Sequence, residues 1–270
     1  MLKFIDLLFK KKINFDEKKY YKWINSSKNF EKLDNLGIIP TSLLIGINDQ
    51  KNQIINNTIK FAKGYKTNNA LLWGVRGNGK STLVKSIFKE LSIEFNYLKL
   101  IELNKEDIGQ ILDIYKILNK HRNFRFIIFI DDLSFEKSDI EYKNIKSMID
   151  GTISNQPNNI VIYVTSNRRH LMPEDMIDNE KSSAIHTHEN IEEKISLSDR
   201  FGLWIGFHNL SQEDYLKIIK SYCKYFKVEI TENDLKKSIS WSISRGNRSG
   251  RTAWQYFLEL ASDKNVIIDF

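Results

Sequence analysis

The sequence contains a single cysteine, Cys223, among its 270 residues, so no internal disulfide can form. This scarcity favours a reducing compartment, and we expect a cytoplasmic protein. No stretch approaches the roughly 18 uninterrupted apolar residues of a membrane span, so we expect no transmembrane segment. Residues 1–15 include a short apolar run that Asp6 interrupts, which is not typical of a signal peptide. That run fits a helix packed on the protein or, alternatively, one lying on a membrane surface.

The composition is that of a soluble globular protein, with 41% hydrophobic and 28% charged residues. A chain of this length can bury a full core and suits one large domain, or one domain with a small appendage. The net charge of +7 permits binding to nucleic acid or another polyanion. It does not establish such a partner, because the chain is rich in Lys, Asn and Ile together, and a general compositional bias could produce this richness without selection for any partner.

Short apolar runs alternate with helical patterns in the middle of the chain. The expected strands are the apolar runs 70–75, 96–103, 124–132, 158–167 and 202–209. The segment 41–64 is expected to be a turn followed by a helix that ends at Gly64, and further helices are expected over 81–93, 106–120 and 143–151. This order predicts an α/β fold, a three-layer α/β/α sandwich with a mainly parallel sheet buried on both faces. Its ligand should bind beyond the carboxyl ends of the strands.

Three regions are expected along the chain. Residues 1–40 form an N-terminal extension without a recognisable chemical motif, and residues 41–209 form the α/β nucleotide-binding domain. After Asn209 no further strand is expected, and residues 210–270 read as a small helical lid subdomain. Two of its helices open with the spacing of a capping box, Ser211 with Asp214 and Thr231 with Asp234.

The segment 68–85 carries the P-loop pattern G-x-x-x-x-G-K-[ST], formed by Gly74, Gly79, Lys80 and Ser81. Glycine lets successive backbone N–H groups face a phosphate, and the following helix adds the positive end of its dipole. Lys80 supplies a cation for the β- and γ-phosphates, and Ser81 supplies a hydroxyl to Mg²⁺. Because an apolar run precedes the loop and an amphipathic helix follows it, we predict a site for ATP and Mg²⁺.

Polar residues end the neighbouring apolar runs. Asp131 and Asp132 end the run 124–132, where Asp131 could hold Mg²⁺ and Asp132 could orient or deprotonate an attacking water. The alternative is that these paired acids cap a helix. Asn167 ends the run 158–167 and could position that water or sense the γ-phosphate, although Asn also ends strands as a turn former.

Arginines occur at two further places. Arg200 directly precedes the last apolar run, and Arg245, Arg248 and Arg251 crowd the start of the last helix. Guanidinium groups neutralise the charge that develops during phosphoryl transfer. The alternative is a surface salt bridge, such as one between Arg200 and Asp199. A separate pair, His186 and His188, has a spacing that can ligate metal, but its polar surroundings favour a solvated loop.

Together these features, in this order, resemble the AAA+ ATPases, whose parts are called Walker A, Walker B, sensor 1, arginine finger and sensor 2. More closely, the chain resembles the bacterial AAA+ family known as domain of unknown function 815, over about residues 40 to 262. The runs that carry this similarity are 56–85, 129–136, 165–179, 192–204 and 245–257.

The resemblance implies roles for individual residues. Nucleotide contacts are implied at Gly77, Asn78, Gly79, Lys80, Ser81 and Thr82, with adenine packing near residues 45–47. It further implies Asp131 on Mg²⁺, Asn167 as sensor 1, Arg200 as the arginine finger and Arg251 as sensor 2, with Arg248 in reserve. One departure from the AAA+ pattern is Asp132, where Glu is usual, so either the site is built around the shorter side chain or hydrolysis is slow. Glu136 is a more distant candidate for the base.

The predicted function is an ATP- and Mg²⁺-dependent ATPase that couples ATP binding and hydrolysis to oligomer assembly or to remodelling of a macromolecular partner. A homo-oligomer is expected, because the resemblance places Arg200 at the ATP of a neighbouring subunit. Two alternatives remain open. One is a nucleotide-gated nucleic-acid-binding module, similar to helicase loaders, with little turnover. The other is a P-loop kinase for a small molecule, against which the helical lid and Arg200 argue.

Overall fold

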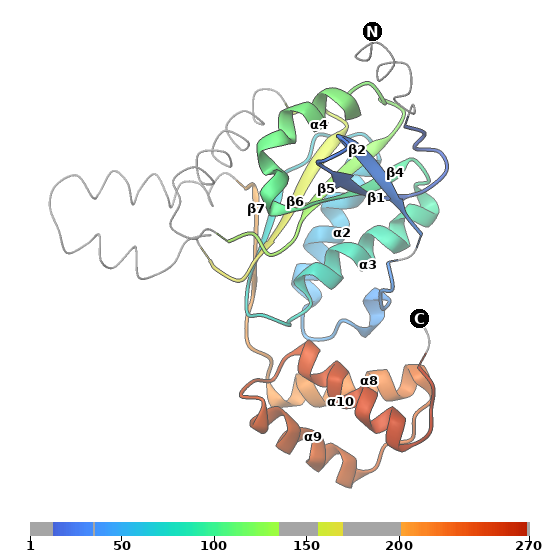
Figure 1. The fold of residues 1–270 in the computed structure, drawn as a ribbon. Coiled ribbons are helices and arrows are strands. Elements are labelled where there is room, and N and C mark those ends of the chain that lie inside the picture. The colour runs from blue at the N-terminus through green and yellow to red at the C-terminus, as the bar shows by residue number, and fades with distance from the viewer. Residues whose placement is uncertain (1–12, 35, 135–155, 170–200, 269–270) are drawn as a thin grey trace, which may run out of the picture.

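The computed structural model describes residues 13–34, 36–134, 156–169 and 201–268 (Figure 1). The described strands are β1 (Tyr20–Ile24), β2 (Asn29–Leu33), β3 (Ala70–Gly74), β4 (Leu98–Leu103), β5 (Arg125–Ile130), β6 (Ile160–Ser166) and β7 (Leu203–Phe207). The described α-helices are α2 (Asn48–Ala62), α3 (Lys80–Glu94), α4 (Ile111–Leu118), α8 (Gln212–Phe226), α9 (Glu232–Ser244) and α10 (Gly250–Asp263). Two 3₁₀-helices are η1 (Thr41–Leu43) and η2 (Lys105–Gln110).

The strands form one seven-stranded sheet in the order β2-β1-β4-β5-β6-β3-β7. All neighbouring pairs are parallel except β1 and β2, which are antiparallel. Strand β3 lies next to the edge strand β7 and pairs with it on one side and with β6 on the other, with Ala70 opposite Leu203 and Tyr163. The carboxyl ends of β3, β5 and β6 therefore meet at one edge of the sheet, as the sequence predicted.

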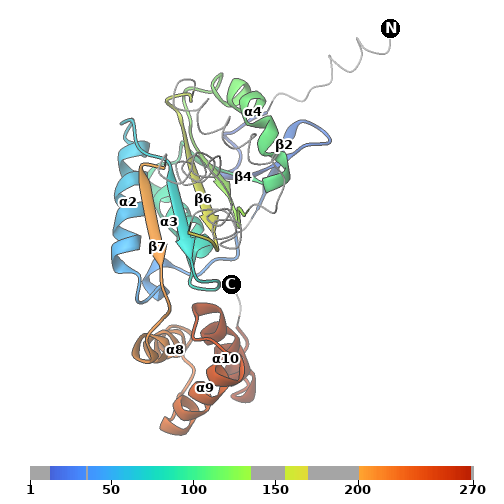
Figure 2. The ribbon, with the colours of Figure 1, turned by 90° about the vertical axis from the view of Figure 1, so that its left-hand side faces the viewer.

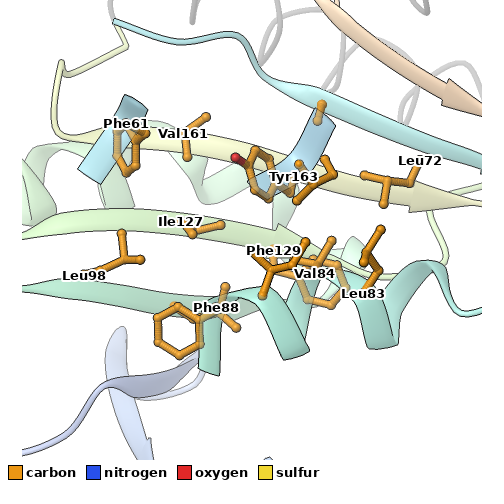
Figure 3. Close-up of a cluster of buried hydrophobic side chains, with 14 of the residues drawn as sticks. Phe61, Leu72, Leu83, Val84, Phe88, Leu98, Ile127, Phe129, Val161 and Tyr163 are labelled. Atoms are coloured by element: carbon orange, nitrogen blue, oxygen red, sulfur yellow. The ribbon is translucent and has the colours of Figure 1, made fainter. Parts of the chain in front are cut away.

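Helices cover both faces of the sheet. The helices α2 and α3 lie on one face and α4 on the other (Figure 2). Strands β5 and β6 are almost continuously apolar because both of their faces are buried. Figure 3 shows the α2/α3 side, where the following side chains pack together: Phe61, Leu72, Leu83, Val84, Phe88, Leu98, Ile127, Phe129, Val161 and Tyr163. The buried hydroxyl of Tyr163 is hydrogen-bonded to Asn57 (3.0 Å) and Thr58 (2.9 Å), so this core leaves that group satisfied.

The helices α8, α9 and α10, called the lid helices below, have a hydrophobic cluster of their own beside the carboxyl edge of the sheet (Figure 1). Its centre includes Tyr215, Ile219 and Phe257, all fully buried. The predicted capping box of α9 is confirmed, because the Thr231 hydroxyl accepts from the Asp234 N–H and the Asp234 carboxylate accepts from the Thr231 N–H.

The sequence-based prediction of a mainly parallel three-layer sheet is confirmed, with two differences in the elements. The first is the strand pair β1 and β2, for which the sequence analysis gave no secondary structure; Tyr21 and Trp23 are buried there against Phe15 and Phe30. The second is the helix expected over 106–120, whose first part is the 3₁₀-helix η2. The helix expected over 143–151 lies outside the described residues. Over the described ranges, no helix is long and apolar enough to cross a membrane.

Candidate functional site: a P-loop facing the lid helices

A cavity of about 630 Å³ lies at the carboxyl edge of the sheet, where the P-loop faces the lid helices. One part of its lining is polar and comes from the loop after β3 and from the ends of β5 and β6. The other part is apolar and comes from residues near η1 and from the lid helices: Leu43, Leu44, Ile45, Ile47, Leu210, Ile218, Tyr222 and Trp254. The predicted site at the strand ends therefore coincides with a cavity that has a polar and an apolar side.

The glycines of the P-loop adopt backbone conformations that other residues rarely adopt. Gly77 and Gly79 have φ of 82° and 86°, and a Cβ on Gly77 would lie 3.0 Å from both the Arg251 Cβ and the Ser249 Oγ. Gly74, at the end of β3, has φ of 124°, and its Cβ would lie 2.0 Å from the Phe207 carbonyl oxygen of β7. Gly74 therefore packs against the neighbouring strand, outside the cavity lining, whereas Gly77 and Gly79 line the cavity.

Lys80 begins α3 and is 6% exposed. Its ammonium group donates to the Gly74 and Val75 carbonyl oxygens at 2.8 and 2.9 Å and to Asn167 Oδ1 at 3.1 Å. Burial lowers the pKa of Lys80 to about 8, and the negative charges of Asp132 and Asp131 oppose this lowering. The lysine is thus a buried cation held between the loop and the end of β6, which favours an anionic ligand.

Ser81 and Asp131 meet at the same edge. The Ser81 hydroxyl donates to Asp131 Oδ1 at 2.5 Å, and the Thr165 hydroxyl donates to the same oxygen. A hydroxyl beside a carboxylate is a set of hard oxygen donors that suits Mg²⁺, which usually takes one or two protein ligands together with phosphates and water. Within the described residues there is no group of three or more His, Cys, Asp or Glu that could hold a metal. The donor set therefore fits Mg²⁺ rather than a metal enclosed by protein ligands.

Asp132 lies in the left-handed region with φ of 51°, a conformation that Asp tolerates better than most residues. Its N–H donates to the Thr165 hydroxyl (2.9 Å), and the next N–H, of Leu133, donates to the Thr165 carbonyl oxygen (2.8 Å). These bonds tie the turn after β5 to β6. As a result the Asp132 carboxylate accepts a hydrogen bond from Asn167 Nδ2 through Oδ1, and its Oδ2 lies 3.5 Å from Arg76.

The P-loop is also bonded directly to the lid side of the cavity. The Asn78 side chain is buried and donates to the His208 carbonyl oxygen at 2.6 Å, at the start of the connection from β7 to α8. The N–H of Arg251, in the first turn of α10, donates to the Gly77 carbonyl oxygen at 3.0 Å. Arg251 also lines the cavity, where its charge contributes to lowering the pKa of Lys80.

The predicted site residues are placed as follows. The cavity lining brings together Gly77, Asn78, Gly79, Lys80, Ser81, Thr82, Asp131, Asp132, Asn167 and Arg251. The predicted adenine-packing residues Ile45 and Ile47 also line it. Arg248 lines a different hollow beside Ile243, and Arg245 lies over the Trp241 ring at 4.1 Å. The predicted finger Arg200, the alternative base Glu136 and the two histidines His186 and His188 lie outside the described residues.

Among the cavity residues that were not predicted from the sequence are Arg76, Tyr222 and Trp254. Arg76 occupies a variable position of the P-loop pattern, so the motif gave it no role. Tyr222 and Trp254 fall on apolar stripes of α8 and α10, which sequence reasoning assigns to the core of the lid helices. Helical spacing shows that these aromatic side chains are buried but not that they also face a cavity.

Comparison with known proteins shows the family and the fold of the chain. The family described as "Protein of unknown function (DUF815)" matches residues 16–264, and no curated protein matches the chain. Among solved structures, a variant of RuvB from Thermotoga maritima superposes with a TM-score of 0.52 at 18% identity, covering 84% of this chain and 66% of that one. The Orc1 protein of Aeropyrum pernix, solved in complex with DNA, gives a TM-score of 0.56 at 13% identity, covering 88% and 68%.

The chain thus spans about two thirds of the length of these two structures. At such identities the similarity shows the fold alone. That fold is the AAA+ P-loop NTPase fold, with its mostly parallel sheet and flanking helices.

Proposed function

The chain belongs to the family described as "Protein of unknown function (DUF815)", and we propose from the geometry of its P-loop that it is an AAA+ ATPase that binds and hydrolyses ATP. The observation that carries the proposal is the convergence of two contacts at one cavity. Lys80 contacts Asn167, and Ser81 contacts Asp131. These four side chains come from three separate elements and supply the cation, the metal ligands and the polar amide that phosphoryl transfer uses.

ATP suits the two sides of the cavity. Its volume of about 630 Å³ lies within the range of small-molecule sites. The triphosphate would be held by the N–H groups of Gly77 to Ser81 and by the Lys80 ammonium. The adenine would pack among the apolar residues, with Ile45 and Ile47 on one side and Tyr222 and Trp254 from the lid helices.

Each polar residue has a role in this proposal. Ser81 and Asp131 would hold Mg²⁺, which when bound supplies positive charge to the β- and γ-phosphate oxygens. Asn167 would hold the attacking water beside Asp132, whose carboxylate would accept the proton. Arg251, which is bonded through its N–H to the Gly77 carbonyl oxygen, would add positive charge from the lid side.

We further propose that ATP hydrolysis is coupled to assembly and to the remodelling of a partner. The bond from the Arg251 N–H to Gly77 joins the P-loop to α10, and the bond from Asn78 to His208 joins it to the connection that leads to α8. A change of nucleotide at the P-loop would therefore shift the position of the lid helices. We assign residues 41–209 to the nucleotide-binding domain, 210–270 to a helical lid and 1–40 to an N-terminal extension whose strands β1 and β2 complete the sheet of the nucleotide-binding domain. Assembly into a homo-oligomer would bring Arg200 to a neighbouring ATP, and the assembly would remodel a macromolecular partner. Nucleic acid is one such partner, since the net charge of +7 favours a polyanion.

Binding of ATP and Mg²⁺ measured by calorimetry tests the proposal. Lys80→Ala should abolish binding, because Lys80 is the buried cation of the loop. The matched control is Lys116→Ala on α4, which removes the charge of an exposed lysine that is not part of the cavity lining. Unchanged affinity in Lys80→Ala, or no binding by the unaltered protein, would contradict the assignment of the P-loop.

A further inference from the structure

Arg76 is a second cation in the P-loop itself. It lies in the loop between β3 and α3 and lines the cavity beside Gly77 and Lys80. Its side chain is 72% exposed, and its Nη2 lies 3.5 Å from Oδ2 of Asp132, whose side chain is 53% exposed. Neither the P-loop pattern nor the function proposed above gives this arginine a role.

The Asp132 carboxylate is held from two directions. Asn167, which also accepts from Lys80, donates to Oδ1, while Arg76 pairs with Oδ2. The contacts therefore run from Lys80 through Asn167 and Asp132 back to Arg76 in the same loop. The guanidinium of Arg76 adds to the lowering of the Lys80 pKa, for which burial is the main cause. Arg76 and Lys80 thus place two positive charges close together in one loop. An anion bound between them would offset the repulsion between these charges.

The pair between Arg76 and Asp132 is one that a stronger anion can displace. Ion pairs between exposed side chains contribute little to stability, because both partners are well solvated and lose side-chain entropy. A terminal phosphate carries more negative charge than a carboxylate, and a guanidinium binds it through two parallel hydrogen bonds. Exchange of the carboxylate for a phosphate is therefore favourable for Arg76.

We propose that the partner of Arg76 depends on which nucleotide is bound to its own subunit. It pairs with Asp132 when no terminal phosphate is present, and with the γ-phosphate when ATP is bound. The exchange leaves Oδ2 of Asp132 free only in the ATP-bound state, while Asn167 continues to hold Oδ1. Arg76 is thus a residue that distinguishes ATP from ADP and positions Asp132, and this inference rests on the proposed ATPase function.

The test compares the affinities for ATP and ADP, measured by calorimetry with Mg²⁺. Arg76→Ala should weaken ATP binding about tenfold, as for loss of a charge-assisted contact, and should change ADP binding less than about twofold. Arg76→Lys should give an intermediate loss, because it keeps the charge but not the two-pronged geometry. Lys116→Ala is the matched control: Lys116 is 76% exposed and lies 3.1 Å from Asp113, which is 57% exposed. It should leave both affinities unchanged.

A double-mutant cycle with Asp132→Asn tests the exchange itself. Removing the carboxylate should tighten ATP binding more when Arg76 is present than in the Arg76→Ala background, because only then does a competing pair disappear. Equal effects in the two backgrounds would contradict the exchange.

The outcomes separate this inference from the proposed function. If the unaltered protein binds ATP and ADP but Arg76→Ala weakens both equally, or weakens neither, Arg76 does not recognise the γ-phosphate and the ATPase proposal stands. If the unaltered protein binds neither nucleotide, both proposals are wrong. Because Arg76 is largely exposed, the variant should keep the unfolding temperature of the parent protein, which circular dichroism checks.

Discussion

Replacing Lys80 by methionine should increase the stability of the folded protein at neutral pH while it removes ATP binding. Lys80 is 6% exposed, and burial lowers its pKa from 10.5 to about 8. A lowered lysine pKa means that the folded state disfavours the charged form. Methionine keeps most of the side-chain length, so the exchange removes the charge without leaving a large void.

The magnitude follows from that pKa. This lowering of the pKa corresponds to about 3 kcal/mol, at about 1.4 kcal/mol per pH unit. Because the cavity is open to solvent, which screens the charge, the expected penalty of the Lys80 charge is about half of this value. Methionine also gives up the hydrogen bonds to the carbonyl oxygens of Gly74 and Val75 and to Asn167. Solvent in the cavity replaces part of these bonds, and the expected net gain in the free energy of unfolding is about 1 kcal/mol.

The gain should depend on pH in a definite direction. Below pH 8 both states of the unaltered protein carry the Lys80 proton, and the full penalty of the buried charge is present. Between pH 8 and 10.5 the unfolded chain binds more protons than the folded one, so the stability of the unaltered protein rises with pH. The advantage of Lys80→Met should therefore be largest at pH 7 and should shrink by pH 9.5.

Urea unfolding of both proteins at pH 7 and pH 9.5, without nucleotide, measures this difference. Lys116→Met serves as the control, because Lys116 is exposed and its replacement should produce no comparable pH dependence. The buried charge of Lys80 does not destabilise the fold if Lys80→Met is less stable than the unaltered protein at pH 7, or if the difference in stability between them is the same at both pH values.

Two further predictions concern turnover. Asp132→Asn should keep ATP binding but suppress hydrolysis, since an amide cannot accept a proton from water; an active variant, in an assay of phosphate release, would move the role of base to another residue such as Glu136. Lys80→Ala and Arg200→Ala should each be inactive alone, and Arg200→Ala should lower the rate of ATP hydrolysis by a factor of about 10³ to 10⁵. Mixed together, they should regain part of the activity, because some interfaces then combine an intact Arg200 with an intact P-loop. Inactivity of a mixture shown to co-assemble would exclude a finger acting between subunits.

The sequence predicted most of the fold because the central strands are defined by their own composition. The runs that became β5 and β6 are long and apolar, which is typical of strands buried on both faces. The pair β1 and β2 was missed because its segments mix lysines with aromatics and contain no long apolar run. These strands are stabilised by tertiary contacts, with Trp23 packed on Phe30 and Tyr20 opposite Leu100 of β4. The pairing of β1 with β4, which lies far along the chain, cannot be predicted from the local sequence pattern.

The site was predictable where a residue type is tied to a strand end, and not elsewhere. The sequence could predict that Asp131 and Asn167 lie near Lys80, because parallel strands end at one edge of the sheet. Arg76 could not, because its role depends on where an exposed side chain points from a loop. Trp254 could not be assigned either, since its apolar character is equally well explained by packing within the lid helices.

Asp132 stands where the AAA+ pattern usually has Glu, and the structure shows how this shorter side chain is held. The turn after β5 begins at Asp132 itself, whose left-handed backbone is fixed by the two bonds to Thr165. From this backbone the carboxylate already reaches Asn167 on one side and Arg76 on the other. A glutamate on the same Cα would carry its carboxylate one methylene further and would have to give up or shift these contacts. We therefore infer that the site is built around aspartate, because the backbone of the turn and the shorter side chain together place the carboxylate between Asn167 and Arg76.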